Sequence, residues 1–351
     1  MKKIKTQKVS IPANILSKTT VVDTEQVLQE GLSRKHGKKY IEYRKRYNSI
    51  VNDHEHNTDF DYPTTVVLEL LNRCNLECIM CYQGYRNDAV KNTINDVLID
   101  KIFEDFSENK LQALMLSISE PLLYKDIARV LDRARQAEIM DLFLFTNGSL
   151  LTEEKSKIIL ESSVTRLFIS IDAATQETYD IVRVPVKEKA NKLDVLEENI
   201  KRFMTLRSKL NKSIPLVRVS FVALEENSHE IDDFINKWRG VVDSVEIQRE
   251  TSIELYEDME KDVDYKGKKN SDILRKYNCN KPWGEIAIYS DGTVGPCCNP
   301  VGRNIVIGNV KDSTIKEIWN GKKMKKIRDG FVNNNPVDVC KICLDNQKNN
   351  M

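Results

Sequence analysis

The chain has 351 residues, and its 54 Lys and Arg residues almost balance its 53 Asp and Glu residues, so the formal net charge is +1. This balance gives no basic excess that would drive binding to nucleic acid or to an anionic membrane surface. No stretch approaches the roughly 20 apolar residues of a membrane span, and residues 1–20 contain lysines but no apolar core of a secretion signal. We therefore expect a cytoplasmic protein with neither nucleic acid nor membrane among its partners.

The length predicts more than one structural unit, because single hydrophobic cores usually stop growing near ~250 to 300 residues. Residues 1–61 are polar and charged, and a tract at 28–51 has loosely helical apolar spacing. We expect this segment to be a charged, partly helical N-terminal extension, and we assign no chemistry to it. From residue 62 onward, short β-branched runs alternate with longer amphipathic stretches, which is the pattern of repeated βα units around a parallel sheet.

The span 62–249 contains six predicted strands separated by helices, so we expect it to form the core domain. The helical stretches show the apolar period of 3.6 residues, and the strands are short apolar runs. Six such repeats predict an α/β fold, a partial TIM-like barrel of six βα units. The predicted strands are 64–71, 113–117, 141–146, 166–171, 216–223 and 244–248, and the predicted helices are 95–107, 127–137, 153–161, 193–210 and 230–238.

Residues that carry chemistry follow the carboxyl ends of the first four predicted strands. In barrels of this kind the reactive loops leave the sheet at those ends. Because the order of these residues follows the order of the strands, we expect one shared site at that end of the barrel. The residues are Cys74, Cys78 and Cys81 after the first strand, Ser119, Glu120 and Pro121 after the second, Thr146, Asn147 and Gly148 at the third, and Ser170 and Asp172 at the fourth.

The eight cysteines are bunched in the sequence, which in a reducing compartment indicates metal ligands rather than disulfides. Three of them, Cys74, Cys78 and Cys81, have the spacing C-x3-C-x2-C, which lets a short loop wrap three corners of one cubane cluster. Iron-sulfur cubanes normally take four cysteines. A set of three therefore leaves one iron open to a small molecule.

With this cysteine spacing directly after a strand of a βα-repeat chain, the sequence resembles the radical S-adenosylmethionine (radical SAM) superfamily. The resemblance implies that Cys74, Cys78 and Cys81 are the catalytic residues and hold a [4Fe-4S] cluster. It also implies that the amino and carboxylate groups of S-adenosylmethionine chelate the open iron. One-electron reduction, by a flavodoxin- or ferredoxin-like donor, would then yield methionine and a 5'-deoxyadenosyl radical that abstracts a substrate hydrogen.

The resemblance also implies a set of residues around the cofactor. Glu120 stands in Ser-Glu-Pro where the family has a Gly-Gly-Glu-Pro run, so it is the candidate acceptor for the cofactor's ammonium, although Glu-Pro is also an ordinary turn at a helix start. Met80 occupies the usual place of an aromatic residue, and it would pack on adenine or simply fill the core. The implied cofactor-binding residues are Met80, Tyr82, Ser119, Glu120, Thr146, Asn147, Ser170, Asp172 and Arg183.

For several of these residues a purely structural interpretation stays open. Asn147-Gly148 is also a common turn signal, and Ser170-x-Asp172 before a helix is also an ordinary capping pattern. Arg183 and Arg218 are candidates for holding a carboxylate, because guanidinium groups bind carboxylates with two hydrogen bonds. Pairing with a surface acid is the alternative for both. None of the four histidines is assigned as a ligand.

A charged tract at 250–278 predicts a linker before a cysteine-containing module at 279–351. The pair Asp291-Gly292 predicts a tight hairpin. One cysteine lies before the hairpin, the adjacent Cys297 and Cys298 follow it, and a C-x2-C pair lies near the end. These thiols suffice for a four-thiolate cage with one thiol over, because two adjacent cysteines do not readily serve one tetrahedral set of corners.

This layout is similar to the one-cluster auxiliary domain called Twitch, a short relative of the SPASM domain of radical SAM enzymes. The resemblance implies a second [4Fe-4S] cluster on Cys279, Cys297, Cys340 and Cys343, with Cys298 as a reserve ligand or a buried small residue. A structural zinc site is the alternative, because zinc also takes four thiolates.

Two clusters imply a net two-electron oxidation, with the auxiliary cluster accepting the second electron. From the resemblance we expect an oxidoreductase that dehydrogenates a carbon-bound hydroxyl of a small polyol, sugar or aminocyclitol. A maturase that modifies a small precursor peptide, with a leader-binding element in 1–61, is the alternative enzyme. A non-catalytic scaffold that binds zinc through both cysteine groups is the alternative outside enzymes.

Overall fold

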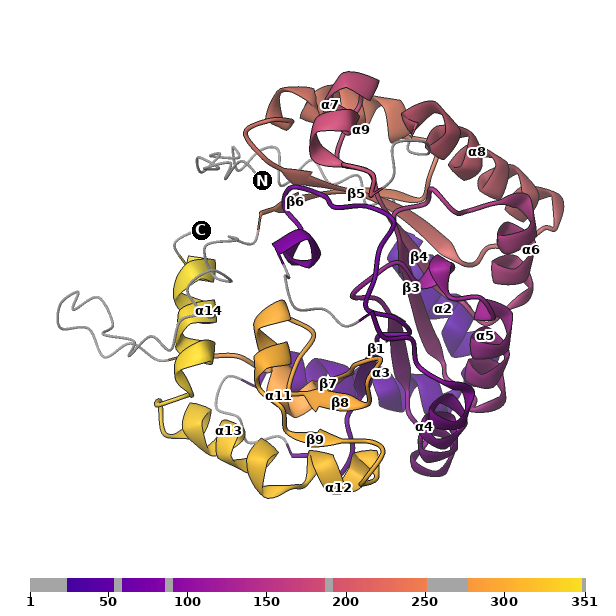
Figure 1. The fold of residues 1–351 in the computed structure, drawn as a ribbon. Coiled ribbons are helices and arrows are strands. Elements are labelled where there is room, and N and C mark those ends of the chain that lie inside the picture. Colours follow the sequence, from indigo (N-terminus) through magenta and orange to yellow (C-terminus); the bar gives the residue numbers. More distant parts are fainter. Residues whose placement is uncertain (1–23, 54–58, 86–90, 187–191, 251–276, 349–351) are drawn as a thin grey trace.

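The computed structural model describes residues 24–53, 59–85, 91–186, 192–250 and 277–348. Its centre is one curved sheet in the order β6-β5-β4-β3-β2-β1-β7-β8-β9 (Figure 1). The strands are β1 (Thr65–Leu68), β2 (Ala113–Leu116), β3 (Asp141–Thr146), β4 (Arg166–Ser170), β5 (Leu216–Ala223), β6 (Ser244–Arg249), β7 (Glu285–Ile288), β8 (Thr293–Gly295) and β9 (Gly308–Asn309). All neighbours from β6 to β7 are parallel, and the last two pairs are antiparallel.

The predicted α/β fold, a partial barrel of six βα units, is confirmed by this sheet and its crossover helices. The largest difference in a strand boundary is at the first strand, which was predicted at 64–71 but ends at Leu68, because Leu71 bridges to Thr93 instead of continuing the ladder. The other strand boundaries agree to within one residue. The described helices of the barrel are α4 (Asp96–Asn109), α5 (Ile127–Gln136), α6 (Glu153–Glu161), α7 (Gln176–Val182), α8 (Leu193–Lys209) and α9 (Ile231–Trp238).

Local sequence explains where several of these helices begin. Asn95, Asp126, Thr152 and Thr175 each accept a backbone N–H of the first helical turn, which satisfies a donor that the helix itself cannot pair. The apolar face of each helix is buried against the outer side of the sheet, where Figure 1 shows the helices arranged around the strands.

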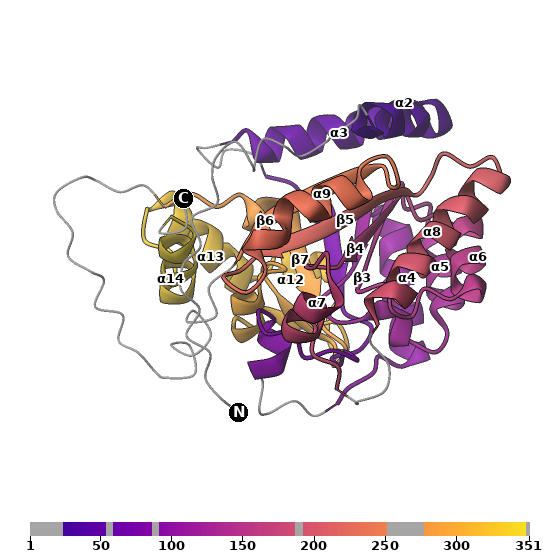
Figure 2. The same cartoon turned by 90° about the horizontal axis from the view of Figure 1, so that it is seen from above.

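The N-terminal helices α2 (Thr24–His36) and α3 (Lys38–Val51) lie outside the barrel, across one end of it (Figure 2). Leu28, Tyr40 and Tyr43 pack against Ala113 and Met140, at the starts of β2 and β3. The Tyr43 hydroxyl donates to Asp141 Oδ2 at 3.1 Å. The helix pair therefore covers the amino ends of the strands, opposite the end that carries the predicted site.

The cysteine-containing C-terminal module continues the barrel sheet, which the sequence did not predict. β7 pairs in parallel with β1, with Val67 opposite Ala287. The predicted hairpin at Asp291-Gly292 is present between β7 and β8, and Gly292 has a φ of 87°, which favours glycine. The rest of the module consists of α11 (Lys281–Gly284), α12 (Ile315–Trp319), α13 (Lys322–Val332), α14 (Asp338–Lys348) and a 3-10 turn, η4 (Pro300–Asn304). Of the linker predicted at 250–278, residues 251–276 lie outside the described residues.

A buried ion pair fastens the module to the barrel. Glu69, fully buried after β1, accepts Arg303 Nη1 at 2.6 Å, and it also accepts the backbone N–H and hydroxyl of Ser290. Lys316 and Asp61 form a second ion pair between the module and the preceding chain, but both side chains are largely exposed. Among the described residues, no helix is long and apolar enough to cross a membrane.

Replacing Arg303 by Met should lower the free energy of unfolding by about 3 kcal/mol, because the substitution leaves the Glu69 carboxylate buried without its cation. Anaerobic urea denaturation followed by tryptophan fluorescence measures this loss. Lys316→Met is the matched control, since it breaks an exposed ion pair of the same module and should cost less than about 1 kcal/mol. Equal losses in the two variants would contradict the role given to the buried pair.

Candidate functional site

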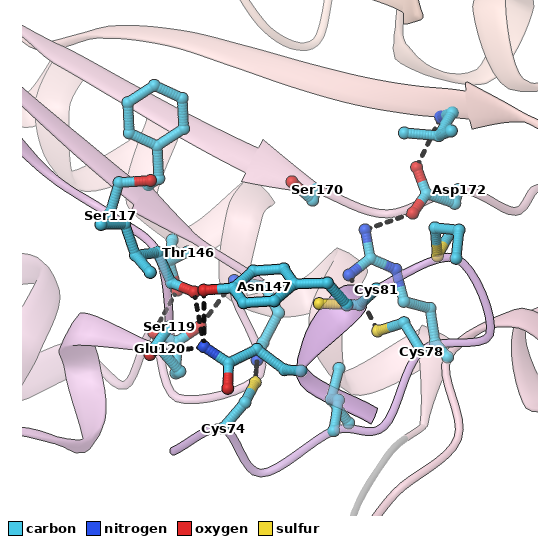
Figure 3. Close-up of a pocket in the computed structure, with 18 of the residues that line it drawn as sticks. Cys74, Cys78, Cys81, Ser117, Ser119, Glu120, Thr146, Asn147, Ser170 and Asp172 are labelled. Atoms are coloured by element: carbon cyan, nitrogen blue, oxygen red, sulfur yellow. Dashed lines mark hydrogen bonds and ion pairs between the residues drawn. The ribbon is translucent and has the colours of Figure 1, made fainter. Parts of the chain in front are cut away.

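A cavity of about 390 Å³ lies at the carboxyl ends of the barrel strands. The three cysteines of the loop after β1 line it, and so do all nine residues that the sequence predicted for cofactor binding (Figure 3). The lining residues that the sequence analysis did not name are Leu76, Gln83, Ser117, Ile118, Phe145, Val222, Gln248, Arg249, Glu250 and Asn299. The strand-end pattern thus brought its residues to one place, as expected for parallel strands.

The three-cysteine loop is held by backbone hydrogen bonds to the last residue of α7 and to the segment after it. Glu77 N–H donates to Val184 O at 2.7 Å, and Ile79 N–H donates to Val182 O at 3.2 Å. Within the loop, Cys81 N–H donates to Cys78 O. These backbone hydrogen bonds hold the three-cysteine loop in place.

The Cys78 side chain is buried, and those of Cys74 and Cys81 are partly buried. Burial, with smaller contributions from neighbouring groups, raises the pKa of Cys74 to about 12 and that of Cys81 to about 11. A metal centre reverses this, because a coordinating thiol is deprotonated outright by the charge of the metal. The three cysteines therefore fit an iron-sulfur cluster, because positively charged iron would stabilise their thiolate forms.

Arg183 and Asp172 form a buried ion pair next to Cys78. The Arg183 Nη2 group pairs with Asp172 Oδ2, and Nη1 donates to Cys78 Sγ at 3.3 Å. The other carboxylate oxygen, Asp172 Oδ1, accepts Val222 N–H at 2.7 Å. Burial opposes the charge of Arg183, yet Asp172 and Cys78 outweigh it and raise the pKa of Arg183. A permanent positive charge therefore lies against one of the predicted cluster ligands.

Arg218, the other arginine considered from the sequence, is not among the residues that line the cavity. It pairs with Glu246 at 2.8 Å and lies over the Phe168 ring, with its guanidinium carbon 3.6 Å from the ring centroid. Arg218 therefore pairs with an acidic residue, which was the alternative to holding a carboxylate of the cofactor or substrate.

Glu120 joins the loops after β2 and β3. Its Oε1 accepts the Thr146 hydroxyl at 2.7 Å and Leu122 N–H at 3.0 Å, and its Oε2 accepts Asn147 N–H at 2.7 Å. Burial raises the pKa of Glu120, and these hydrogen bonds oppose the shift. Among the described residues, no cation forms an ion pair with Glu120, and three donors leave one of about four acceptor positions of its carboxylate. A ligand ammonium fits that position.

The polar residues beside Glu120 connect the second and third loops to the cysteines. Asn147 Nδ2 donates to Asn75 Oδ1 at 2.9 Å and contacts Cys74 Sγ at 3.7 Å. Gln83 Nε2 donates to the Tyr82 hydroxyl, to Ile118 O and to Ser119 Oγ, at 3.0 to 3.2 Å. Gln83 was missed from the sequence because a single glutamine after a cysteine motif carries no signal of its own.

The C-terminal cysteines gather in two groups around Lys281. Cys340 and Cys343 are three residues apart on α14 and therefore share one face of the helix. Their thiols interact electrostatically with that of Cys279. Cys297 and Cys298 follow β8, and η4, the turn after them, packs against α14. The predicted ligands of the second cluster are thus brought toward one another.

Cys297 and Cys298 have different surroundings. Cys297 Sγ lies against Gly302, where a Cβ would come within 2.7 Å of the sulfur, so the glycine leaves room for this thiol. Cys298 packs against Val67 and Ala287 on the inner side of the sheet, and its Sγ accepts Lys281 Nζ at 3.3 Å. Among the described residues, no three Cys, His, Asp or Glu side chains converge as they would on a single metal ion.

Comparison with known families gives two matches along the chain. Residues 68–237 match the radical SAM superfamily, and residues 279–344 match SPASM, an iron-sulfur cluster-binding domain. The two matched segments contain the two predicted cysteine groups, one each. They also leave between them the tract that was predicted as a linker.

Curated relatives share part of the chain. The probable GTP 3',8-cyclase of Methanocaldococcus jannaschii is 25% identical over 177 residues, which cover 50% of this chain and 54% of that protein. The probable GTP 3',8-cyclase of Methanothermobacter thermautotrophicus is 28% identical over 167 residues, or 47% of this chain and 50% of that protein. The chain therefore spans about half the length of these relatives.

Solved structures share the fold over more of the chain. Streptococcus suis SuiB has a TM-score of 0.59 at 15% identity, over 88% of this chain and 79% of that chain. SuiB has also been solved bound to the precursor peptide SuiA. The structure of anSMEcpe with bound AdoMet has a TM-score of 0.56 at 16% identity, over 75% of this chain and 79% of that chain.

Replacing Glu120 by Gln should weaken binding of S-adenosylmethionine about tenfold or more, because a hydrogen bond to a charged group contributes about 1.5 to 3 kcal/mol. The amide oxygen of glutamine can still accept the Thr146 hydroxyl and Leu122 N–H, so of the three hydrogen bonds to Glu120 only the one from Asn147 N–H should be lost. Anaerobic equilibrium dialysis of the cluster-loaded protein measures the affinity. Glu161→Gln, at an exposed position on α6, is the control, and unchanged affinity in Glu120→Gln would refute the ammonium contact.

Iron analysis separates the two adjacent cysteines. We expect Cys297→Ala to lose about four irons per chain and Cys298→Ala to retain them, since a cubane needs its full set of thiolates. Each variant is purified anaerobically, and iron and sulfide are counted against the unsubstituted protein. The reverse result would make Cys298 the ligand.

Proposed function

Because this chain belongs to the radical SAM superfamily and carries a C-terminal iron-sulfur cluster-binding domain, we propose that it oxidises a carbon-bound hydroxyl of a small polar substrate. S-adenosylmethionine and [4Fe-4S] clusters are the cofactors of this enzyme. The proposal concerns the reaction and the substrate class, within the small polyols, sugars and aminocyclitols.

The residues of the site fit these cofactors. The loop after β1 offers three thiols, and the buried Glu120 offers a carboxylate to an ammonium. The proposed ligands are Cys74, Cys78 and Cys81 for the catalytic cluster and Cys279, Cys297, Cys340 and Cys343 for the auxiliary cluster. The proposed cofactor contacts are Met80, Tyr82, Ser119, Glu120, Thr146, Asn147, Ser170, Asp172 and Arg183, all of which line the cavity.

One observation carries the proposal: Asn299, directly after Cys297 and Cys298, lines the same cavity as Cys74, Cys78 and Cys81. A substrate in this cavity would therefore be close to the three-cysteine loop and to the residue that follows Cys298 in the C-terminal module. An electron acceptor next to the substrate is what a two-electron oxidation requires after the first hydrogen atom has been removed. A module placed elsewhere would support a purely structural role instead.

S-adenosylmethionine with the cluster that Cys74, Cys78 and Cys81 would hold would supply abstraction of one hydrogen atom from carbon, and the auxiliary cluster would supply an acceptor for the second electron. The hydroxyl proton would pass to water, so that C–OH becomes C=O and the electrons balance. The chain contributes positioning: Glu120 orients the cofactor, and the loops hold the substrate carbon within reach. We propose a flavodoxin- or ferredoxin-like protein as the external electron donor.

The lining of the cavity supports a small, hydroxylated substrate. Ser117, Gln248 and Asn299 add hydroxyl and amide groups to the lining, and the Gln248 amide also donates to Glu246 Oε2 at 2.9 Å. A volume of about 390 Å³ lies within the range of small-molecule sites, roughly 300 to 1,000 Å³. Neutral donors and acceptors of this kind suit hydroxyl groups, which both donate and accept hydrogen bonds.

The same lining makes a nucleoside triphosphate a weaker candidate. Among the residues that the structure describes, the arginines that line the cavity are Arg183, which pairs with Asp172, and Arg249, which precedes Glu250 in the sequence. Triphosphates are commonly held by several cations or by backbone N–H groups at helix starts. GTP is therefore a comparison substrate in the test, although the curated relatives carry the name GTP 3',8-cyclase.

A precursor peptide is the alternative substrate, and the fold shared with SuiB is the observation in its favour. At 15% identity this likeness concerns the fold and does not transfer the substrate. The non-catalytic zinc scaffold is set aside, because the first cysteine group lies within a radical SAM domain.

The experiment combines cofactor counting with a substrate panel. The protein is purified anaerobically, where we expect about eight irons per chain, and it is then incubated with dithionite, S-adenosylmethionine and a panel of polyols, sugars and aminocyclitols. A substrate of the proposed class should yield one 5'-deoxyadenosine per carbonyl formed, and deuterium at the oxidised carbon should move into 5'-deoxyadenosine. Cys78→Ala is the negative control.

Other outcomes decide against the proposal. Turnover of GTP without a carbonyl product, or modification of a peptide with no activity on the panel, would replace the proposed substrate class. About four irons and one zinc per chain would remove the auxiliary electron acceptor. Zinc without iron would reject radical chemistry altogether.

A further inference from the structure

We propose that Lys281 tunes the auxiliary cluster: its ammonium, held by Glu285 and directed at Cys298, makes that cluster easier to reduce and so a better electron acceptor. The inference rests on the proposed function, since it concerns the cluster to which the oxidation assigns the second electron. Lys281 is a positioning residue in this proposal, because its charge acts on the potential from beside the ligand set, whether or not Cys298 itself holds iron, and it is not among the described residues that line the cavity.

The geometry defines a triad of Lys281, Glu285 and Cys298. Lys281 Nζ lies 2.8 Å from Glu285 Oε1 and 3.3 Å from Cys298 Sγ. The same Glu285 oxygen accepts the backbone N–H of Cys298 at 3.0 Å. The carboxylate therefore holds both the lysine and the cysteine, and it fixes the direction in which the ammonium donates.

The fold anchors this triad firmly. Lys281 lies on the single turn of α11, two residues after Cys279, and Glu285 is the first residue of β7. Glu285 is opposite Thr65 of β1 in the parallel ladder, so its backbone belongs to the barrel sheet. The side chain of Glu285 is only 13% exposed, whereas that of Lys281 is 40% exposed. The buried carboxylate of Glu285 thus holds the half-buried ammonium of Lys281 against the sulfur of Cys298.

The charge of Lys281 reaches more than one cysteine. It lowers the pKa of Cys279, Cys297 and Cys343 in addition to that of Cys298, whereas Glu285 raises the pKa of Cys279, Cys297 and Cys298. Whichever of the two adjacent cysteines holds iron, the ligand set lies beside an ion pair whose two members act in opposite directions. Hydrogen bonds to the sulfurs and the net charge around them are among the factors that set cluster potentials.

A positive charge near a cluster favours the state that carries one more electron. The sign of the effect follows: removing the ammonium should lower the midpoint potential, and removing the neighbouring carboxylate charge should raise it. A simple packing role predicts no such reversal. The two substitutions together therefore separate electrostatic tuning from structural support.

The test is a potentiometric titration of the auxiliary cluster followed by electron paramagnetic resonance. It uses the full chain with Cys74→Ala, Cys78→Ala and Cys81→Ala, so that the spectrum reports the auxiliary cluster alone. Into this parent protein we introduce Lys281→Met, Lys281→Arg, Glu285→Gln and, as the control, Lys326→Met at an exposed position on α13. Iron is counted in every variant.

The expected result is a lower midpoint potential in Lys281→Met, a smaller shift in Lys281→Arg, a higher potential in Glu285→Gln, and no shift in Lys326→Met. A potential in Lys281→Met equal to that of the control, with about four irons still bound, would overturn the proposal. If Lys281→Met does not retain iron, Glu285→Gln decides, and the absence of a rise in its potential overturns the proposal. A parent protein without any cluster would instead overturn the proposed function.

Discussion

Parallel pairing on both sides of β1 is the constraint on which the arrangement of the site depends. On one side β1 pairs with β2, and the three-cysteine loop leaves the sheet beyond its carboxyl end. On the other side it pairs with β7, so that Val67 and Ala287 lie next to each other in the sheet. Cys298 packs against the apolar cluster that these two residues form. One short, fully buried strand thus sets the position of both cysteine groups. The buried pair of Glu69 and Arg303 reinforces this junction.

The sequence predicted the parts of the molecule whose signals are local. Apolar runs located all six barrel strands, and the strand-end rule placed Glu120, Asn147 and Ser170 around one cavity. The pairing of β1 with β7 could not be predicted in this way, because it joins segments more than two hundred residues apart and depends on tertiary packing. For the same reason Asn299 gave no signal as a residue of the site.

Hydrogen-bond partners also lay beyond sequence analysis. The pattern identified Glu120 and Asp172 as polar residues near the cofactor, but it did not show that backbone N–H groups and an arginine already engage them. A related arrangement occurs at both cysteine groups: a cation held by a carboxylate donates to one sulfur. Arg183 with Asp172 does so at Cys78, and Lys281 with Glu285 does so at Cys298. The spacing of the cysteines does not predict either ion pair.

The helices α2 and α3 make the two ends of the barrel different. Their tyrosines pack over the starts of β2 and β3, and Tyr43 is tied to the buried Asp141 beneath them. Packed side chains therefore cover the starts of β2 and β3. The cavity lies at the other end of the strands, and if the proposed cofactor and substrate both enter there, the order in which they bind and the order in which methionine and product leave would help to keep a radical away from water.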